Sequence, residues 1–199
     1  MAGELCALAD VRSLMQKKSA DTAQDALITA LIVPASKAIM KWCEREFAPT
    51  STAVARVFEY PWEGEFLSLA PYDVRTVTSV VVDSDVGAGV TLAADEYRLW
   101  PRPARDGTFM AVRLRPLSVA TGRVLFRNRE VTVTGDWGFP SVPDEAKWAT
   151  AMTVQHWLTV NVAAYRGADD GGDVRAIPKR GIPPEAIQLV APFKRMPFG

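Results

Sequence analysis

The chain is 199 residues long, 48% hydrophobic and 23% charged, with 23 basic and 23 acidic side chains. A chain of this length and composition can bury a globular core, which excludes a disordered protein, and its zero net charge excludes a globally basic nucleic-acid binder. The charges are nevertheless unevenly spread, because residues 98–129 hold eight arginines and a single acid, whereas residues 1–97 hold 8 basic and 14 acidic side chains.

Two helices are predicted at the start of the chain. Asp10 can cap a short first helix that ends near Lys18, and the second helix begins near Asp21. Pro34 lies inside the second pattern, which predicts either a kink or a junction of two helices before the element ends by Phe47. The apolar residues of this pattern recur at the spacing of one helix face and are Leu27, Ile28, Leu31, Ile32, Ala35, Ala38, Ile39 and Trp42.

The middle of the chain changes to the period of strands. Strands are predicted over residues 54–60, 66–69, 75–82, 92–100, 109–117, 123–126 and 130–134. Val112 and Leu114 alternate with Arg113 and Arg115, so this strand is predicted to have one apolar face and one arginine face. Residues 127–129 are a plausible hairpin turn between the last two strands.

A long helix follows the strands. Pro143 suits the first helical position and the acids Asp144 and Glu145 suit the first turn, so the helix is predicted to start there, to run to Arg166 and to end at Gly167. The remaining tail contains five prolines after residue 177, which exclude a long helix, although Pro184 to Val190 could make one or two helical turns. The tail also contains several apolar residues. Such a segment is suited to docking along the surface of a partner.

These elements predict an α+β fold. The N-terminal helices and the one long C-terminal helix should pack on each other, because neither can bury its apolar face alone. The strands then form an inserted antiparallel sheet or small barrel, and the tail forms an extended C-terminal arm. The predicted parts are N-terminal helices over 1–50, an inserted β domain over 51–136, the long helix over 137–167 and the arm over 168–199.

No catalytic or metal-binding motif is present in the sequence. His156 is the only histidine, and Cys6 and Cys43 form no metal or redox motif, so we expect a packed or interface histidine and two reduced, partly buried thiols. We therefore expect no catalytic activity, no cofactor and no metal. Residues 26–40 are too short for a membrane span and contain Lys37, and no signal peptide is predicted, so we expect no membrane association.

The arginine-rich segment and an aromatic loop remain as candidate surfaces. The arginines either form a solvated sheet face paired with acidic residues of this or a neighbouring subunit, or lie near DNA and contact its phosphates without reading sequence. Trp137 and Phe139 either fill the core between sheet and helix or anchor an interface. The candidate subunit-interface or DNA-channel residues are Arg113, Arg115, Arg127, Arg129, Trp137 and Phe139.

Four segments, in this order, resemble the head-to-tail connector (adaptor) family of long-tailed, siphovirus-type bacteriophages. The first is the 21–47 helix ending in Trp-Cys-Glu-Arg-Glu-Phe, and the second is the proline-containing entry to a strand at 69–80. The third and most specific is the Val/Thr strand, glycine and aromatic pair at 131–139, followed by Val142-Pro143 and a long helix. The fourth is the C-terminal segment 182–195. The inserted strand region is longer than in the smallest members of the family.

The resemblance implies a structural virion protein. Such adaptors form a ring, usually of twelve copies, between the portal and a stopper or tail protein, and genomic double-stranded DNA passes non-specifically through its lumen. The protein would be assembled in the host cytoplasm and would reside at the head-tail joint of the virion. The family often reaches the portal with its C-terminal arm, and the residues expected to do so here are Ile177, Ile182, Ile187, Leu189, Phe193, Lys194, Arg195 and Phe198.

Two other functions stay open at this point. Another phage head-completion, stopper or tail-completion protein would bind tail components but not the portal. A small hydrolase or sugar-binding module would need paired carboxylates across a cleft, or a polar site around His156.

Overall fold

The computed structural model describes residues 3–16, 22–59, 66–82, 89–102, 104–114, 130–169 and 181–195, with only the backbone over 161–169. The chain divides into two compact units. One, which we call the helical unit, is formed by Met1–Glu44 together with Val142–Arg195. The other, the β unit, is formed by Arg45–Ser141.

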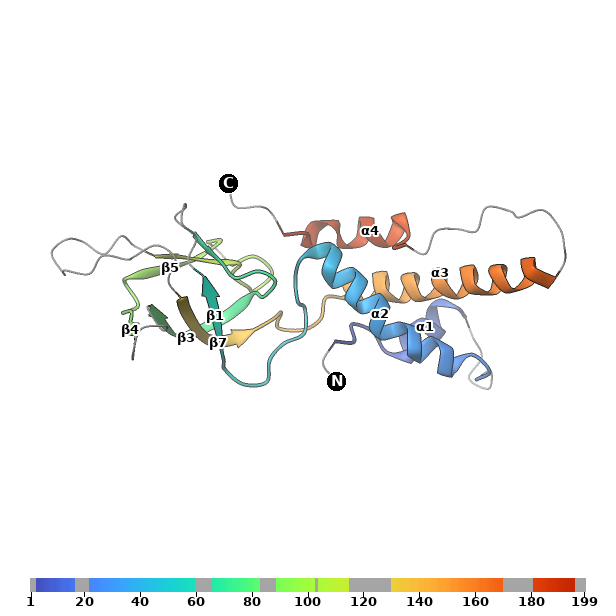
Figure 1. Cartoon of the computed structure of the whole chain (residues 1–199), viewed down its shortest axis with the longest axis horizontal. Coiled ribbons are helices and arrows are strands. Elements are labelled where there is room, and N and C mark those ends of the chain that lie inside the picture. Colours follow the sequence, from blue (N-terminus) through green and yellow to red (C-terminus); the bar gives the residue numbers. More distant parts are fainter. Residues whose placement is uncertain are drawn as a thin grey trace. The chain divides into compact units, whose positions relative to one another are not determined.

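In its described residues the helical unit contains four helices and a short 3-10 turn (Figure 1). They are α1 (Leu8–Leu14), α2 (Asp25–Cys43), α3 (Asp144–Asp169), α4 (Pro184–Val190) and η2 (Ala191–Phe193). The predicted start of the long helix is confirmed, since α3 begins at Asp144 directly after Pro143. The prediction that Gly167 ends this helix is wrong, because α3 continues to Asp169 and one glycine costs a helix only about 1 kcal/mol.

Helix α2 supplies the core of the helical unit. Its buried face holds Ile28, Ile32, Ala35 and Ile39, and the first three of these pack with residues of α1 and α3. Pro34 lies on the exposed side, and one helix passes through it, which excludes the alternative of two helices. By length and composition α2 is long and apolar enough to cross a membrane, and 33% of its apolar stretch is buried inside the structure.

The described strands of the β unit form two antiparallel sheets. Sheet A has the strand order β1 (Val54–Glu59), β7 (Glu130–Trp137), β3 (Val74–Val82) and β4 (Val90–Thr91). Sheet B has the order β2 (Phe66–Ser68), β6 (Ala111–Leu114) and β5 (Tyr97–Trp100). The predicted α+β class with antiparallel pairing is confirmed, and the strand predicted at 123–126 lies outside the described residues.

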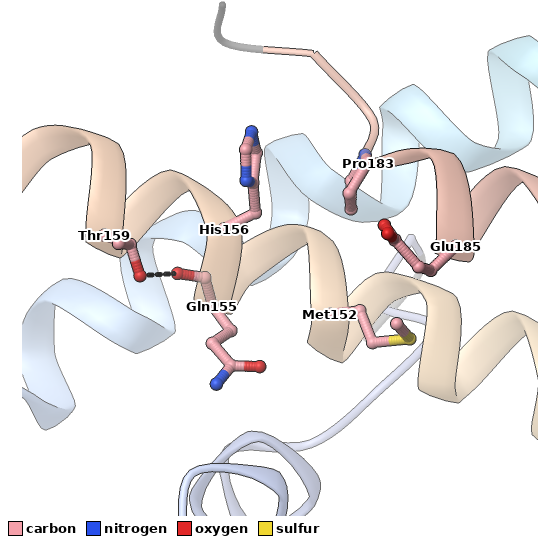
Figure 2. A pocket seen from close by; sticks show the side chains of 6 residues that line it. All are labelled: Met152, Gln155, His156, Thr159, Pro183 and Glu185. Atoms are coloured by element: carbon pink, nitrogen blue, oxygen red, sulfur yellow. Dashed lines mark hydrogen bonds between the residues drawn. The ribbon is translucent and has the colours of Figure 1, made fainter. Parts of the chain in front are cut away.

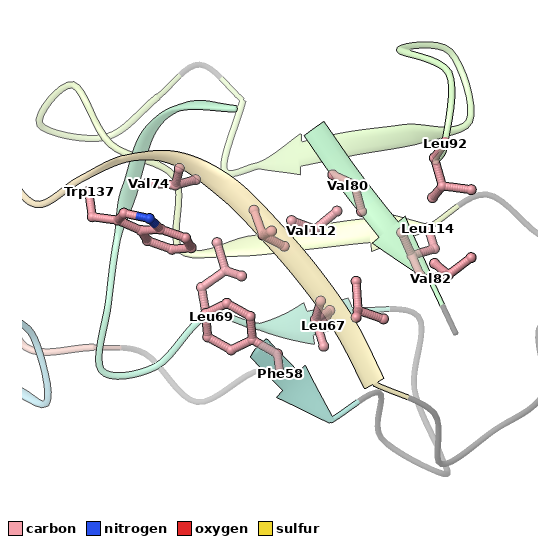
Figure 3. Close-up of a cluster of buried hydrophobic side chains, with 12 residues drawn as sticks. Phe58, Leu67, Leu69, Val74, Val80, Val82, Leu92, Val112, Leu114 and Trp137 are labelled. Carbon is pink, nitrogen blue, oxygen red and sulfur yellow. The ribbon is translucent and has the colours of Figure 1, made fainter. Parts of the chain in front are cut away.

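The two sheets of the β unit share one core (Figure 3). Sheet A contributes Phe58, Val80, Val82, Val131 and Val133, and sheet B contributes Leu67, Val112 and Leu114. Because successive side chains of a strand point to opposite faces, the neighbours of these residues lie on the two outer faces.

The predicted C-terminal arm is described between residues 181 and 195. Within this range it folds as α4 and η2, and Ala186 and Val190 are fully buried against the rest of the helical unit. The amide of Arg195 donates to the carbonyl oxygen of Cys43 at 3.0 Å, and its Nε donates to that of Glu44 at 3.2 Å. This part of the arm is helical and packed rather than extended, because its apolar residues complete a core.

Candidate partner-binding surfaces

The chain enters the β unit through a buried arginine. Arg45 follows Glu44, the residue that caps the C-terminus of α2, and its side chain is 1% exposed. Its Nε donates to the Asp73 carboxylate at 2.7 Å, and its Nη2 donates to the Thr108 hydroxyl at 3.1 Å. Its guanidinium also lies 4.6 Å from the ring centre of Phe139. Since every one of these groups is held inside the unit, Arg45 is a structural residue.

The aromatic loop is part of the same interior. Trp137 and Phe139 are 1% and 2% exposed, and the indole N–H of Trp137 donates to the carbonyl oxygen of Val54 at 2.7 Å. Gly138 between them has a φ of 80°, and a Cβ there would collide with the backbone of Ala48. Trp137 and Phe139 are therefore core residues of the β unit, which agrees with the first of the two roles that the sequence left open for them.

The outer face of sheet B carries two exposed arginines side by side. Arg98 on β5 and Arg113 on β6 are direct cross-strand partners in the antiparallel register, and both are exposed. Phe66 on β2 pairs with Arg113 on its other side, with the guanidinium 5.8 Å from its ring centre. Trp100 contacts Phe66 edge to face at 5.9 Å. We call this set of four residues the arginine face.

The candidate arginines are only partly described. Arg113 is exposed, as the alternating pattern predicts, whereas Arg115, Arg127 and Arg129 lie outside the described residues. Sequence reasoning missed Arg98 as a site residue, because it did not give the register that places this side chain opposite Arg113.

The outer face of sheet A ends in two exposed carboxylates. Glu59 and Glu130 are direct cross-strand partners where β1 and β7 begin their pairing, and both are exposed. Val57, two residues before Glu59 on the same face, is 57% exposed, and its partner is Thr132. We call Glu59, Glu130 and Val57 the acidic edge. The sequence did not predict that Glu59 and Glu130 lie side by side, because the two glutamates are 71 residues apart in the chain.

The C-terminal segment divides into buried and exposed residues. Of the residues predicted to bind a partner, Leu189 and Lys194 are exposed, while Arg195 is buried and holds the end of α2. Lys194 lies over the ring of Trp42 at 5.1 Å. Ile182, Ile187 and Phe193 are half-buried, and Ile177 and Phe198 lie outside the described residues.

His156 lines a small hollow in the helical unit (Figure 2). The hollow has a volume of about 260 Å³, and its lining comes from α3 and the start of α4, namely Met152, Gln155, His156, Thr159, Pro183 and Glu185. The side chains that line it bring together one imidazole and one carboxylate. Among the described residues no group of three or more metal-ligating side chains is found.

The two cysteines are buried free thiols. Burial, reinforced by the carboxylates of Asp10 and Glu4, raises the pKa of Cys6 to about 12. Because the thiolate is the reactive species, Cys6 is held in its unreactive form at neutral pH.

Comparison with known proteins gives a likeness of fold. No protein-family model and no curated protein matches this sequence. A chain from a structure titled "Neck of empty GTA particle computed with C6 symmetry" is 19% identical with a TM-score of 0.50, and the match covers 96% of this chain and 90% of that one. This chain shares its fold with a chain of a particle neck.

Two further solved structures resemble this one. A chain in "Virion of native gene transfer agent (GTA) particle" is 20% identical with a TM-score of 0.47, covering 96% of this chain and 90% of that chain. A chain in "Neck of native GTA particle computed with C12 symmetry" is 18% identical with a TM-score of 0.43, covering 100% and 97%.

Proposed function

We propose that this chain is a structural subunit of the neck of a phage-like particle, specifically a head-to-tail adaptor. Copies of it, twelve by the family resemblance, form a ring between the portal and a stopper or tail protein and extend the channel for genomic double-stranded DNA. The observation that carries this proposal is the fold shared with a particle-neck chain across nearly the full length of both chains. The ordered sequence motifs at 21–47, 69–80, 131–139 and 182–195 agree with it.

The physical design of the chain suits a structural role. The most fully buried polar side chains, such as Arg45 and Asp73, are bonded to each other inside the β unit and are not aimed at a cleft. Fixed, satisfied polar groups of this kind specify a rigid unit. Such a unit is what a ring of identical subunits requires, and we place it in the virion after assembly in the host cytoplasm.

Contact with the portal is assigned to the exposed side of the C-terminal segment. Leu189 and Lys194 project from a segment that Val190 and Arg195 hold in place. Because this apolar and basic surface is already ordered in the free chain, it loses little conformational entropy when a partner binds. The segment proposed to bind the portal is therefore not an unfolded arm, because its buried residues belong to the core of the helical unit.

Capture by purified portal tests the assignment. The double variant Leu189→Glu, Lys194→Glu should reduce portal capture by about tenfold or more, because burying an introduced carboxylate costs several kcal/mol. The matched control is Ala30→Glu at an exposed position of α2, which should bind as the wild type does. Capture by tail components and never by portal would instead indicate a stopper or tail-completion protein.

A further inference from the structure

We propose that the portal contact extends from the C-terminal segment onto α3, where Trp148 and the adjoining hollow receive an apolar side chain of the portal. The proposal rests on the proposed function, and it adds the chemistry of the partner: an apolar side chain with a basic group on one side and an acidic group on the other. The surface consists of Trp148 and Met152 on α3 and of Pro183, Glu185 and Leu189 in and just before α4, and we call it the tryptophan surface.

The two walls of the hollow continue as exposed apolar residues. Met152 of α3 and Glu185 of α4 line the hollow (Figure 2). Because residues four apart lie on one face of a helix, Trp148 continues the wall that contains Met152, and Leu189 continues the wall that contains Glu185. Trp148 is 45% exposed and Leu189 is 36% exposed, so both walls carry apolar area that this chain leaves open to solvent.

Trp148 and Leu189 lie on the same side of the hollow. Helices α3 and α4 pack together and run in opposite directions (Figure 1). The start of α3 and the end of α4 are therefore on the same side of the hollow, and Trp148 and Leu189 lie in these two directions. Single exposed apolar residues are ordinary on protein surfaces, but these two extend one hollow in one direction.

The size and composition of the tryptophan surface favour a protein partner over a small molecule. The volume of the hollow, about 260 Å³, is below the roughly 300–1,000 Å³ of small-molecule sites, so it suits a side chain of a partner. Tryptophan and methionine are enriched at the centres of protein–protein contacts, and tryptophan is among the commonest hot-spot residues. Trp148 beside Met152 and the hollow has this composition.

The charges of the C-terminal segment specify the charges of the partner. Glu185 is exposed at the hollow, in the first turn of α4, and Lys194 is exposed just after η2. Leu189 lies between them in the chain. A portal segment that lies along α4 should therefore present a basic group to Glu185, an apolar side chain to the hollow and Trp148, and an acidic group to Lys194, because complementary charges fix the register of two partners.

Capture by purified portal tests the contribution of Trp148. The variant Trp148→Ala should reduce capture by about tenfold or more, as truncation of a hot-spot side chain does, and Trp148→Phe should restore part of it because it keeps an aromatic ring. The matched control is Leu27→Ala on α2, which should be captured as the wild type is, because Leu27 is also 45% exposed but does not line the hollow. Thermal unfolding shows whether each variant is folded.

The salt dependence of capture tests the predicted order of charges. Glu185→Gln should weaken capture by about threefold to tenfold at low ionic strength, and its difference from the wild type should shrink at 1 M salt, where the Debye length is about 3 Å. The control Asp95→Asn makes the same charge change at an exposed position of the β unit and should be captured as the wild type is. Equal capture of the Glu185 variant and the wild type at low ionic strength would overturn the predicted order.

The outcomes separate the tryptophan surface from the proposed function. Equal capture of the wild type and Trp148→Ala by portal would overturn this surface and leave the proposed function standing. A wild-type chain that portal never captures would overturn both. Loss of capture by a tail component, with portal capture unchanged, would assign Trp148 to that partner instead. Unfolding of Trp148→Ala would also count against the surface, because the exposed ring would then be part of the core.

Discussion

Arg45 and Arg113 belong to the same β unit, and their surroundings are opposite. Arg45 is 1% exposed and is bonded to Asp73 and Thr108, with Phe139 beneath its guanidinium. Arg113 is exposed, and its direct neighbour across the strands is another arginine, Arg98. Arg45 is held by partners in the interior of the unit, whereas Arg113 lies at its surface, between Phe66 and Arg98.

This difference indicates which charges serve the fold and which serve a partner. A buried arginine that lost its carboxylate partner would destabilise the unit, so its contacts are structural. Two arginines directly opposite on adjacent strands do not stabilise the strand pairing, so Arg98 and Arg113 are not explained by the sheet alone. The number of arginines in a segment therefore says less than their register.

The largest expected effect comes from removing the buried arginine. Arg45→Ala leaves the Asp73 carboxylate buried without its cation, so the free energy of unfolding should fall by about 3–5 kcal/mol. Urea denaturation followed by tryptophan fluorescence measures it, because Trp137 lies in the same unit. The control Arg102→Ala, at an exposed position, should change stability by less than about 0.5 kcal/mol. Equal effects of the two substitutions would remove the distinction between buried and exposed arginines.

A smaller loss is expected from the C-terminal segment of the helical unit. Val190 is fully buried, so Val190→Ala should lower the free energy of unfolding by about 1.5–3 kcal/mol. Thermal unfolding measures this loss against Gln188→Ala, an exposed neighbour on α4. An unchanged transition for the Val190 variant would mean that the segment is a detached arm. The same logic implies that deleting residues from Ile177 onward would destabilise the helical unit, instead of leaving its fold intact.

The smallest effect has the opposite sign. Arg98→Glu turns the repulsive cross-strand pair with Arg113 into an attractive one, so the isolated chain should gain about 0.2–1 kcal/mol of stability. Chemical denaturation measures this change in the free energy of unfolding. A variant that loses stability would indicate that Arg98 is a structural residue.

The sequence predicts the helices better than the surfaces. Helical spacing and the Pro143-Asp144-Glu145 signal locate α2 and α3, because each depends on residues close together in the chain. The partner surfaces depend instead on strand register, and the β3–β7 pairing shifts twice, between Val74 and Thr76 and between Val77 and Ser79. Such irregularities cannot be read from alternation alone.

The C-terminal segment is a second case in which the sequence does not predict which residues are buried. Its prolines correctly exclude a long helix, but they did not indicate that Ala186 and Val190 would be buried. Pro184 begins α4 where a missing N–H costs nothing, and the one or two turns that the sequence allowed over Pro184–Val190 are present. Burial against α3 depends on residues elsewhere in the sequence, which composition does not reveal.

The measurement that tests the central claim most directly is a cryo-electron microscopy map of the portal vertex in particles from cells that carry this chain. The account predicts a ring of this protein between the portal and the tail, with the fold of both units recognisable in every copy. Absence of the chain from purified particles, with the neck fully occupied by other proteins, would contradict it.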